Sequence, residues 1–363
     1  MAKNKEDLLK EAARKDEAAN AKSRKDVNQS FWSLVRHQFK KNKIALVALY
    51  MVFLLFAVAI FADFLANDKP IIAKYNGTLY FPVIKDYLVG LGLDRWDADL
   101  VTADWKELDA QGKLSSTIWP PVKYRSSNQD LVNNTAPPGG NHLLGTDAIG
   151  RDVLAGLISG SRIALTIGFL SMSVAISIGI FLGALAGFYG GWVDILISRL
   201  IELVITFPAF FLIITVVAMF QSGSIWLVMI LIGLVSWPGI ARFTRGEFLR
   251  VRNMEYVAAA TALGLSNTRV IFRHVLPNSL APVLVTSAFG IASAILTEAG
   301  LSFLGFGVPP TIVTWGSVLN DARGNISAWW LAVFPGLAIF IAVLCYNLVG
   351  DGLRDALDPR LRD

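Results

Sequence analysis

The residues that could do chemistry in this sequence are few, and their densest group lies in HLLGTDAIGRD, residues 142–152. One histidine and two aspartates there are residue types that can ligate a divalent metal. However, Gly145, Thr146, Asp147 and Gly150 are all residues that favour tight turns. We therefore expect a turn in this stretch, with a metal site as the less favoured alternative.

No other part of the chain carries residues in a catalytic pattern. The sequence has no Gly-x-x-x-x-Gly-Lys loop, which would cradle the phosphates of a nucleotide. His37, His142 and His274 are too scattered for a three-histidine metal centre, and Cys345 is the only cysteine. The sequence therefore predicts a protein that is not an enzyme and binds no metal or cofactor of its own.

The composition indicates what kind of scaffold holds these residues. Of 363 residues, 54% are hydrophobic and 17% are charged, and the mean hydropathy is +0.52. Soluble domains average about 25% charged residues, so these values are typical of a multi-pass membrane protein. The net charge of +5 does not indicate a nucleic-acid partner, because the basic residues cluster beside apolar stretches.

Six apolar segments approach the length of about 20 residues that a helix needs to cross a bilayer. The first segment follows 43 residues of chain, so we interpret it as an uncleaved anchor and not as a signal peptide. The sequence thus predicts an all-α polytopic membrane protein. The predicted spans are residues 44–62, 163–188, 203–220, 225–240, 280–296 and 329–349.

Lysine and arginine predict how the spans are oriented. Residues 1–43 hold 12 of them, and residues 242–273 hold six arginines. Cytoplasmic flanks carry an excess of such residues, so both termini are predicted to be cytoplasmic. The predicted parts are a cytoplasmic tail (1–43), a first span (44–62), an external insert (63–160), a five-helix core (161–350) with a cytoplasmic loop (241–279) and an external loop (298–328), and a cytoplasmic tail (351–363).

The external insert is predicted to be small and irregular. Asn76-Gly77 separates two apolar-rich runs, which is a strong signal for a two-residue hairpin. The stretch 102–112 predicts a short helix that ends at a glycine. Three tryptophans are candidate contacts for an external partner, or members of a small core: Trp96, Trp105 and Trp119.

The predicted spans contain a glycine repeat and a few charged residues. Glycines every four residues in the second span favour close helix packing, because they strip one helix face of side chains. Arg199, Glu202 and Glu298 lie near span ends, where each can reach the interface by snorkelling. No chain of acidic or histidine residues runs through a span, which argues against a proton-driven pump. The glycines are Gly179, Gly183 and Gly187.

The stretch EYVAAATALGLSNTRVIFRHVLPNSLAPVLV predicts two short helices joined by a glycine. Asn253 can cap the first helix, and Gly264 is suited to its C-terminal cap. Ser266 can open the second helix, which should end near Leu276 because Pro277 disfavours helical geometry in the residue before it.

The first of these helices is rich in alanine and has a nearly smooth surface. Glu255 in its first turn is favourable for the helix dipole. Such a rod can lie deep in a partner's groove, because no large side chain holds it off. A re-entry helix at the membrane interface, with no partner, is an equally good interpretation on physical grounds alone.

The spacing in this stretch resembles a signature of permease subunits in binding-protein-dependent ABC importers. That signature reads Glu-Ala-Ala, three residues, Gly, nine residues, Ile, one residue, Leu-Pro. Here alanine stands at the glutamate position and histidine at the isoleucine position, and Glu255 could replace the missing glutamate. The matching residues are Ala258, Ala259, Ala260, Gly264, His274, Leu276 and Pro277.

Further segments resemble the oligopeptide, dipeptide and nickel permease family. Residues 271–278 are similar to its IFRHxLPN pattern, and FKKNKIALVAL, HLLGTDAIGRDVLAGLISGSRIAL, EAGLSFLGFGVPP and VGDGLRDALDPRLR are similar to other parts. The resemblance covers about residues 30–50 and 140–363. ANDKPIIAKYNGTLYFPV in the long insert looks like the long-loop peptide and microcin-C permeases.

The resemblance implies a type I importer transmembrane fold and half of a pathway for peptides or peptide-like solutes in the bacterial inner membrane. Nickel complexes are an alternative cargo, and a membrane-embedded enzyme or a stand-alone channel is a less favoured function. The implied partners are a homologous permease, two ATPase subunits that hold ATP and magnesium, a periplasmic solute-binding protein and lipid. The residues implied in ATPase coupling are Glu255, Ala258, Ala259, Ala260, Gly264, Arg273, His274, Leu276 and Pro277.

Overall fold

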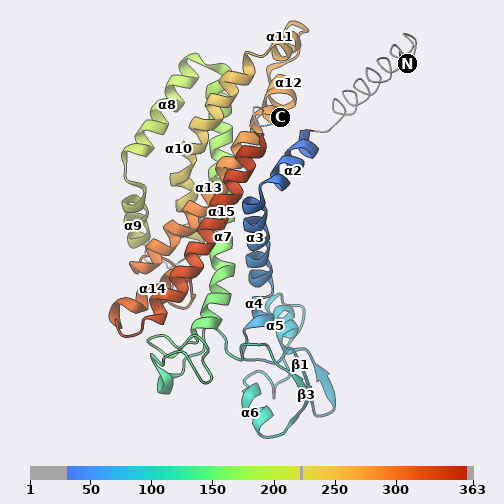
Figure 1. Ribbon diagram of the computed structural model, residues 1–363, viewed down its shortest axis with the longest axis vertical. Helices are drawn as coiled ribbons and strands as arrows, with labels where there is room; N and C mark the ends of the chain where they lie inside the picture. The colour runs from blue at the N-terminus through green and yellow to red at the C-terminus, as the bar shows by residue number, and fades with distance from the viewer. Residues whose placement is uncertain (1–30, 221–223, 358–363) are drawn as a thin grey trace, which may run out of the picture.

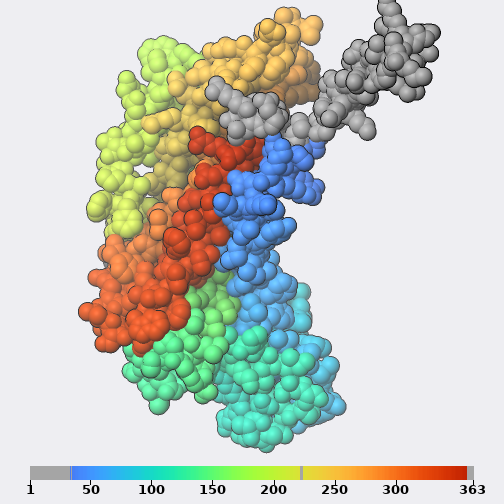
Figure 2. All heavy atoms as spheres, in the orientation of Figure 1, coloured from blue at the N-terminus to red at the C-terminus, as the bar shows by residue number. Residues whose placement is uncertain are grey.

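The computed structural model describes residues 31–220 and 224–357, so the predictions for residues 1–30 and 358–363 lie outside the described residues. Long helices run side by side, and the insert forms a separate lobe at one end of them (Figures 1 and 2). The described chain begins and ends at the opposite end, where the α11 helix also lies (Figure 1).

Within the described residues, five helices are long and apolar enough to cross a membrane, and α8 with α9 makes a sixth span if the two count as one. This confirms the prediction of a helical polytopic membrane protein. The spanning helices are α3 (Lys43–Ile60), α7 (Val153–Tyr189), α8 (Gly191–Thr206) with α9 (Ala209–Phe220), α10 (Ile225–Arg252), the continuous Asn267–Phe303, and α15 (Trp330–Leu357). Shorter helices are α2 (Phe31–Lys41), α4 (Ala62–Leu65), α11 (Glu255–Ala262) and α14 (Trp315–Gly324).

The third predicted span, residues 203–220, is not one straight helix. The chain bends by 76° between α8 and α9. Phe207 has the extended backbone angles φ −84° and ψ 128°, directly before Pro208. Proline disfavours helical geometry in the residue before it, which explains the break.

Two other helices extend beyond their predicted spans. Helix α7 begins at Val153, ahead of the predicted start at residue 163, and α10 continues to Arg252. The first third of the predicted loop 241–279 is therefore helix. Hydropathy marks only the apolar part of a helix, and 37 residues of helix measure about 55 Å against a hydrocarbon core of about 30 Å.

The helix that opens after Gly264 does not end near Leu276, contrary to prediction. Helix α12 (Asn267–Val270) passes through a π-helical turn, η2 (Ile271–Val275), into α13 (Leu276–Phe303). The Leu276 N–H donates to the carbonyl of Ile271, five residues earlier. We attribute the continuation to this wider turn, which accommodates the ring of Pro277 and its missing N–H without ending the helix.

The insert contains an ordered sheet as well as irregular chain. Strands β1 (Ile72–Tyr75), β2 (Thr78–Tyr80) and β3 (Leu114–Ile118) pair antiparallel in the order β2-β1-β3. The predicted hairpin is confirmed, because Asn76 and Gly77 join β1 to β2 with positive φ. The lobe also holds α5 (Pro82–Gly90), α6 (Trp105–Ala110) and η1 (Leu131–Asn133). The predicted helix over 102–112 thus begins three residues later than expected, after the cap Asp104.

The three tryptophans of the insert belong to its core. Trp105 is buried, and Trp96 and Trp119 pack partly buried around the same cluster. The indole N–H of Trp96 donates to Asp86 at 2.9 Å, and that of Trp119 donates to Asp109 at 2.9 Å. Their main role is therefore to hold the lobe together, which argues against Trp105 as a docking contact.

Candidate functional site

The N-terminal cap of helix α11 lies one residue later than predicted. Met254 occupies the cap position, and its carbonyl accepts from the N–H groups of Val257 and Ala258 at 3.0 and 3.1 Å. The Asn253 side chain instead donates to the carbonyl of Leu249 at 3.0 Å, at the end of α10. Asn253 therefore terminates α10 and does not cap α11.

The C-terminal end of α11 matches its prediction. Gly264 has a φ of +76°, a left-handed conformation that favours glycine. The Gly264 N–H donates to the Thr261 carbonyl at 3.0 Å and the Leu265 N–H donates to the Ala260 carbonyl at 3.3 Å. This pair of bonds is a Schellman cap, which turns the chain back toward the spans.

The alanines of α11 do not form a uniformly smooth rod. Ala260 is buried with Val257 against Phe248 of α10 and Val275 of η2. Ala258 and Ala259 face outward and are exposed. The helix thus has an anchored face and a small-residue face.

Three large apolar residues on α11, at its C-terminal cap and on η2 are also exposed, and sequence reasoning missed them. Tyr256 and Phe272 are exposed, and Leu263 is 83% exposed. Tyr256 and Leu263 are seven residues apart, a helical spacing that puts both on the side of Ala259 and could have marked them. Their contiguity with an alanine face is typical of a protein-binding surface.

The remaining candidate residues lie on η2 and the start of α13. Arg273 and Pro277 are exposed, whereas His274 is half-buried. Leu276 packs against the cluster that anchors Ala260. The structure therefore brings Leu276 and Ala260 together, and leaves Arg273 and Pro277 on the surface.

Two of the six arginines brace the end of α10 against the turn between α7 and α8. Arg245 donates two hydrogen bonds to Asp194 of α8. Arg252 donates to the Phe188 carbonyl of α7 at 2.7 Å. These contacts were not predicted, because Asp194 lies about 50 residues from its partner and carries no local signal.

The three glycines of α7 form a close seam with α10. A Cβ atom added to Gly179 would lie 2.6 Å from the Cβ of Ile240, and one on Gly187 would lie 2.6 Å from the Cβ of Phe248. At Gly183 the added atom would lie 2.5 Å from the carbonyl oxygen of Ala241. Side chains cannot fit there, so the seam sets the approach of the two helices.

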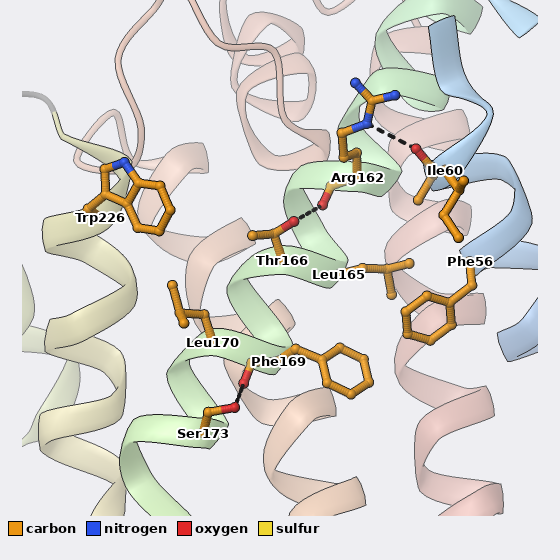
Figure 3. A pocket seen from close by; sticks show the side chains of 10 residues that line it. Phe56, Ile60, Arg162, Leu165, Thr166, Phe169, Leu170, Ser173 and Trp226 are labelled. Atoms are coloured by element: carbon orange, nitrogen blue, oxygen red, sulfur yellow. Dashed lines mark hydrogen bonds between the residues drawn. The ribbon is translucent and has the colours of Figure 1, made fainter. Parts of the chain in front are cut away.

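A groove of about 530 Å³ opens between α3, α7 and α10 (Figure 3). Its walls are mainly apolar, and Trp226 of α10 lies across from Phe56 of α3. The α7 side chains between them include two hydroxyls, and each bonds to the carbonyl four residues back. The exposed stripe of α7 that forms the floor continues away from the insert and comprises Thr166, Phe169, Ser173, Ser177 and Phe181.

Comparison with known protein families decides what this arrangement of helices is. Residues 179–363 match the family described as binding-protein-dependent transport system inner membrane component. The chain belongs to this family. Residues 30–80 of the permease also match the N-terminal transmembrane domain of oligopeptide transport permease C.

Individual relatives of the permease extend the likeness. The inner membrane ABC transporter permease protein YejE of Escherichia coli K12 is 34% identical over 339 residues, which cover 92% of this chain and 97% of that protein. The dipeptide transport system permease protein DppC of Alkalihalophilus pseudofirmus is 40% identical over 248 residues, which cover 68% and 81%. A structure of the MetNI methionine ABC transporter, in an inward-facing conformation, is 18% identical, with a TM-score of 0.48, over 57% of this chain and 98% of that chain.

The long insert is shared with YejE. An alignment over 92% of the permease leaves out only 8% of it, which is less than the 98 residues between 63 and 160. The match to DppC covers 68%. This difference agrees with the long-loop subgroup prediction.

At the insert end of the permease, the 142–152 stretch is a turn whose two aspartates have different partners. The Asp152 carboxylate is hydrogen-bonded to His142 Nδ1 at 2.8 Å, and it caps α7 by accepting from the Ala155 N–H at 2.8 Å. Asp147 bonds instead to the guanidinium of Arg151. Within residues 31–220 and 224–357, no group of three histidine, cysteine or acidic residues could hold a metal ion.

Glu298 is more enclosed than predicted, and Asp321 lies 3.6 Å from Arg151 of this turn. Glu298 is 1% exposed and accepts from the Ser302 hydroxyl at 2.6 Å, so it does not reach the interface by snorkelling. By contrast, Arg199 and Glu202 are exposed and pair with each other. Burial, together with the charge of Asp147, raises the pKa of Asp321 to about 6, although Arg151 opposes this.

Proposed function

We propose that this permease forms half of the translocation pathway of an ATP-driven importer for peptides or peptide-like solutes. Two similarities support a peptide cargo: the named relative DppC is a dipeptide transport permease, and residues 30–80 match an oligopeptide transport permease domain. The permease itself performs no bond-breaking chemistry. Its task is to change conformation when its partners do.

The proposed partners follow from this assignment. Two ATPase subunits, which hold ATP and magnesium, bind at the α11 end, and a solute-binding protein docks at the insert end. This arrangement puts both termini in the cytoplasm and the insert outside, in the bacterial inner membrane. The excess of lysine and arginine near the α11 end supports it.

A homologous permease completes the pathway in this proposal. Helix α7 contacts α3, α10, α13 and α14, and is the most central helix of the described chain. A central helix that keeps an exposed stripe, from Thr166 to Phe181, indicates a fold that a second subunit covers. Its hydroxyls suit contacts between helices inside a membrane.

The main support for a coupling role is that one face of α11 is buried against the permease and the other face is exposed. Its anchored face is fixed by Val257 and Ala260, so the helix cannot move without α10 and η2. Its outer face offers the small side chains of Ala258 and Ala259, and exposed Tyr256 and Leu263 lie within about one turn of Ala259 on either side. A groove in the ATPase subunit can therefore grip the helix closely, and the grip is transmitted to the spans.

Transmission runs along two routes. Through Phe248, α11 is packed against α10, which the Arg245–Asp194 pair fixes to α8. Through Val275, it is packed against η2, which continues directly into α13. A π-helical turn is a common feature of functional sites within helices. A displacement of α11 thus reaches both α10 and α13.

The test is to place a long charged side chain on the outer face. Ala259→Arg should leave α11 folded, because Ala259 is exposed, but it should prevent close docking. We expect loss of uptake and of binding-protein-stimulated ATP hydrolysis in reconstituted vesicles, while pairing with the second permease survives. Ala110→Arg is the control for the added side chain, since Ala110 is also an exposed helical alanine and lies in the insert, away from α11. Wild-type uptake and stimulation by Ala259→Arg would exclude α11 as the coupling element.

A further inference from the structure

Helix α5 in the insert carries an apolar stripe that no described part of the chain covers. Ile84, Tyr87, Leu88 and Leu91 are all exposed, and Leu91 is 72% exposed. Their spacing of three, one and three residues places them on one side of a helix. Phe81, which precedes the helix by one residue, extends the stripe and is also exposed.

The opposite side of α5 is firmly fixed to the lobe. Val83 is buried, and the carboxylate of Asp86 accepts from the Lys69 ammonium at 2.8 Å and from the Trp96 indole at 2.9 Å. The helix therefore cannot rotate to bury its stripe within the lobe. The apolar side must face something outside this chain.

The contacts of Tyr87 show where the apolar stripe lies relative to the end of the α3 span. Its hydroxyl bonds to Asp63 in α4 and accepts from Arg162 of α7 at 3.3 Å. Arg162 also bonds to Asp63 at 2.9 Å and to the Ala59 carbonyl of α3 at 3.0 Å. Ala59 lies at the insert end of α3 and Asp63 in the α4 helix that follows, so α5 lies directly beside the point where a membrane span ends (Figure 1).

The stripe is also next to exposed apolar surface at the end of a membrane span. Ile60 and Phe61, at the end of α3, are 63% and 55% exposed. Ile84 and Leu88 lie within one turn of Tyr87, and Tyr87 is bonded to the residue two positions after Phe61. The apolar surface therefore continues from the span onto α5.

We propose that α5 is an interfacial helix that rests on the bilayer surface at the insert side, with its stripe in contact with lipid. Short amphipathic helices bind at this depth by burying an apolar face, and tyrosine is enriched at the membrane interface. A soluble partner would have to enter the interface to cover the same stripe. In this proposal the lipid contact fixes the height and tilt of the lobe relative to the bilayer.

Spin labels can measure the contact directly. Leu88→Cys and Leu91→Cys, each in a Cys345→Ala background, would carry a nitroxide in the complete complex, reconstituted in phosphatidylethanolamine and phosphatidylglycerol vesicles. Both sites are exposed, so the label disturbs no core. Gln111→Cys is the matched control, because Gln111 is exposed and follows α6, which lies away from α3 (Figure 1).

We expect collisions with oxygen, relative to collisions with a water-soluble nickel chelate, to be several-fold more frequent at Leu88 and Leu91 than at Gln111. A ratio equal to that of Gln111 would show that the stripe faces water and overturn the proposal. Shielding from the chelate that appears only when the solute-binding protein is added would also overturn it, in favour of protein docking. Unchanged thermal melting of each labelled variant would show that the lobe remains folded.

Discussion

Arg245 of α10 and Asp194 of α8 form a two-pronged ion pair, with Nη2 and Oδ2 2.7 Å apart. The Arg245 and Asp194 side chains are 33% and 20% exposed, so water screens the pair only partly. Arg245 lies one turn before Phe248, which anchors α11. The pair therefore connects the first half of the broken span to the element that supports the proposed coupling helix.

Asp194→Asn should destabilise the permease, because it leaves a partly buried guanidinium without its charged partner. We expect a loss of about 1.5–3 kcal/mol in the free energy of unfolding, measured by denaturant titration in detergent. Arg199→Gln is the control, since the Arg199–Glu202 pair is 75% and 55% exposed and should contribute less than about 1 kcal/mol. Equal effects of the two changes would contradict this role for the Arg245–Asp194 pair.

Gly183→Ala should also destabilise the chain, because its new Cβ would lie 2.5 Å from the backbone of α10. Overpacking of this kind costs about 1–3 kcal/mol. Gly246→Ala in α10 should instead stabilise the permease. Nothing lies within 4 Å of an added Cβ there, and alanine is favoured over glycine in a helix by about 1 kcal/mol. Thermal melting of both variants measures the direction of each change in stability. Stabilisation by Gly183→Ala would contradict the close contact of α7 and α10 at this glycine.

Stability should depend on pH through Asp321. The pKa of Asp321 is about 6 in the folded permease, above the ordinary 3.8. At a pH between these two values the folded permease therefore holds a proton on Asp321 that the unfolded chain has released. Its contribution to the free energy of unfolding therefore increases as pH falls from about 7 to about 5. In Asp321→Asn this component should disappear, and melting temperatures across this range measure it. An identical pH profile in the variant would exclude Asp321 as the source.

The orientation of the chain can be tested with single cysteines in a Cys345→Ala background. Cysteines at Gln111 and Ile326 should react with impermeant thiol reagents in intact cells, whereas one at Asn267 should react only after the membrane is opened. All three positions are exposed, and none of them has a positive φ. Labelling of Asn267 from outside would overturn the proposed orientation.

Local sequence signals predicted several features correctly because their causes are local. Asn76-Gly77 forms its hairpin turn and Gly264 its cap, since both need positive φ that other residues resist. Apolar segments marked the spans, because burial in a bilayer depends on composition. In contrast, the inward face of Ala260 and the pairing of Asp194 with Arg245 depend on neighbours from other helices, and no sequence spacing encodes them.

The prolines show most clearly what the sequence determined by itself and what only the tertiary structure decided. The sequence determined where a backbone N–H is missing: Pro208, Pro238 and Pro277 all lie in or beside predicted helix. At Pro208 the helix breaks, and the flanking α8 and α9 are mostly exposed in this chain. Pro238 is buried against neighbouring helices and α10 continues through it. Exposed Pro277 is accommodated instead by the wider turn η2, so the helix also continues there. The surroundings of each proline thus decided whether it ended its helix, because the lost hydrogen bond is offset by packing at Pro238 and by a π-helical turn at Pro277.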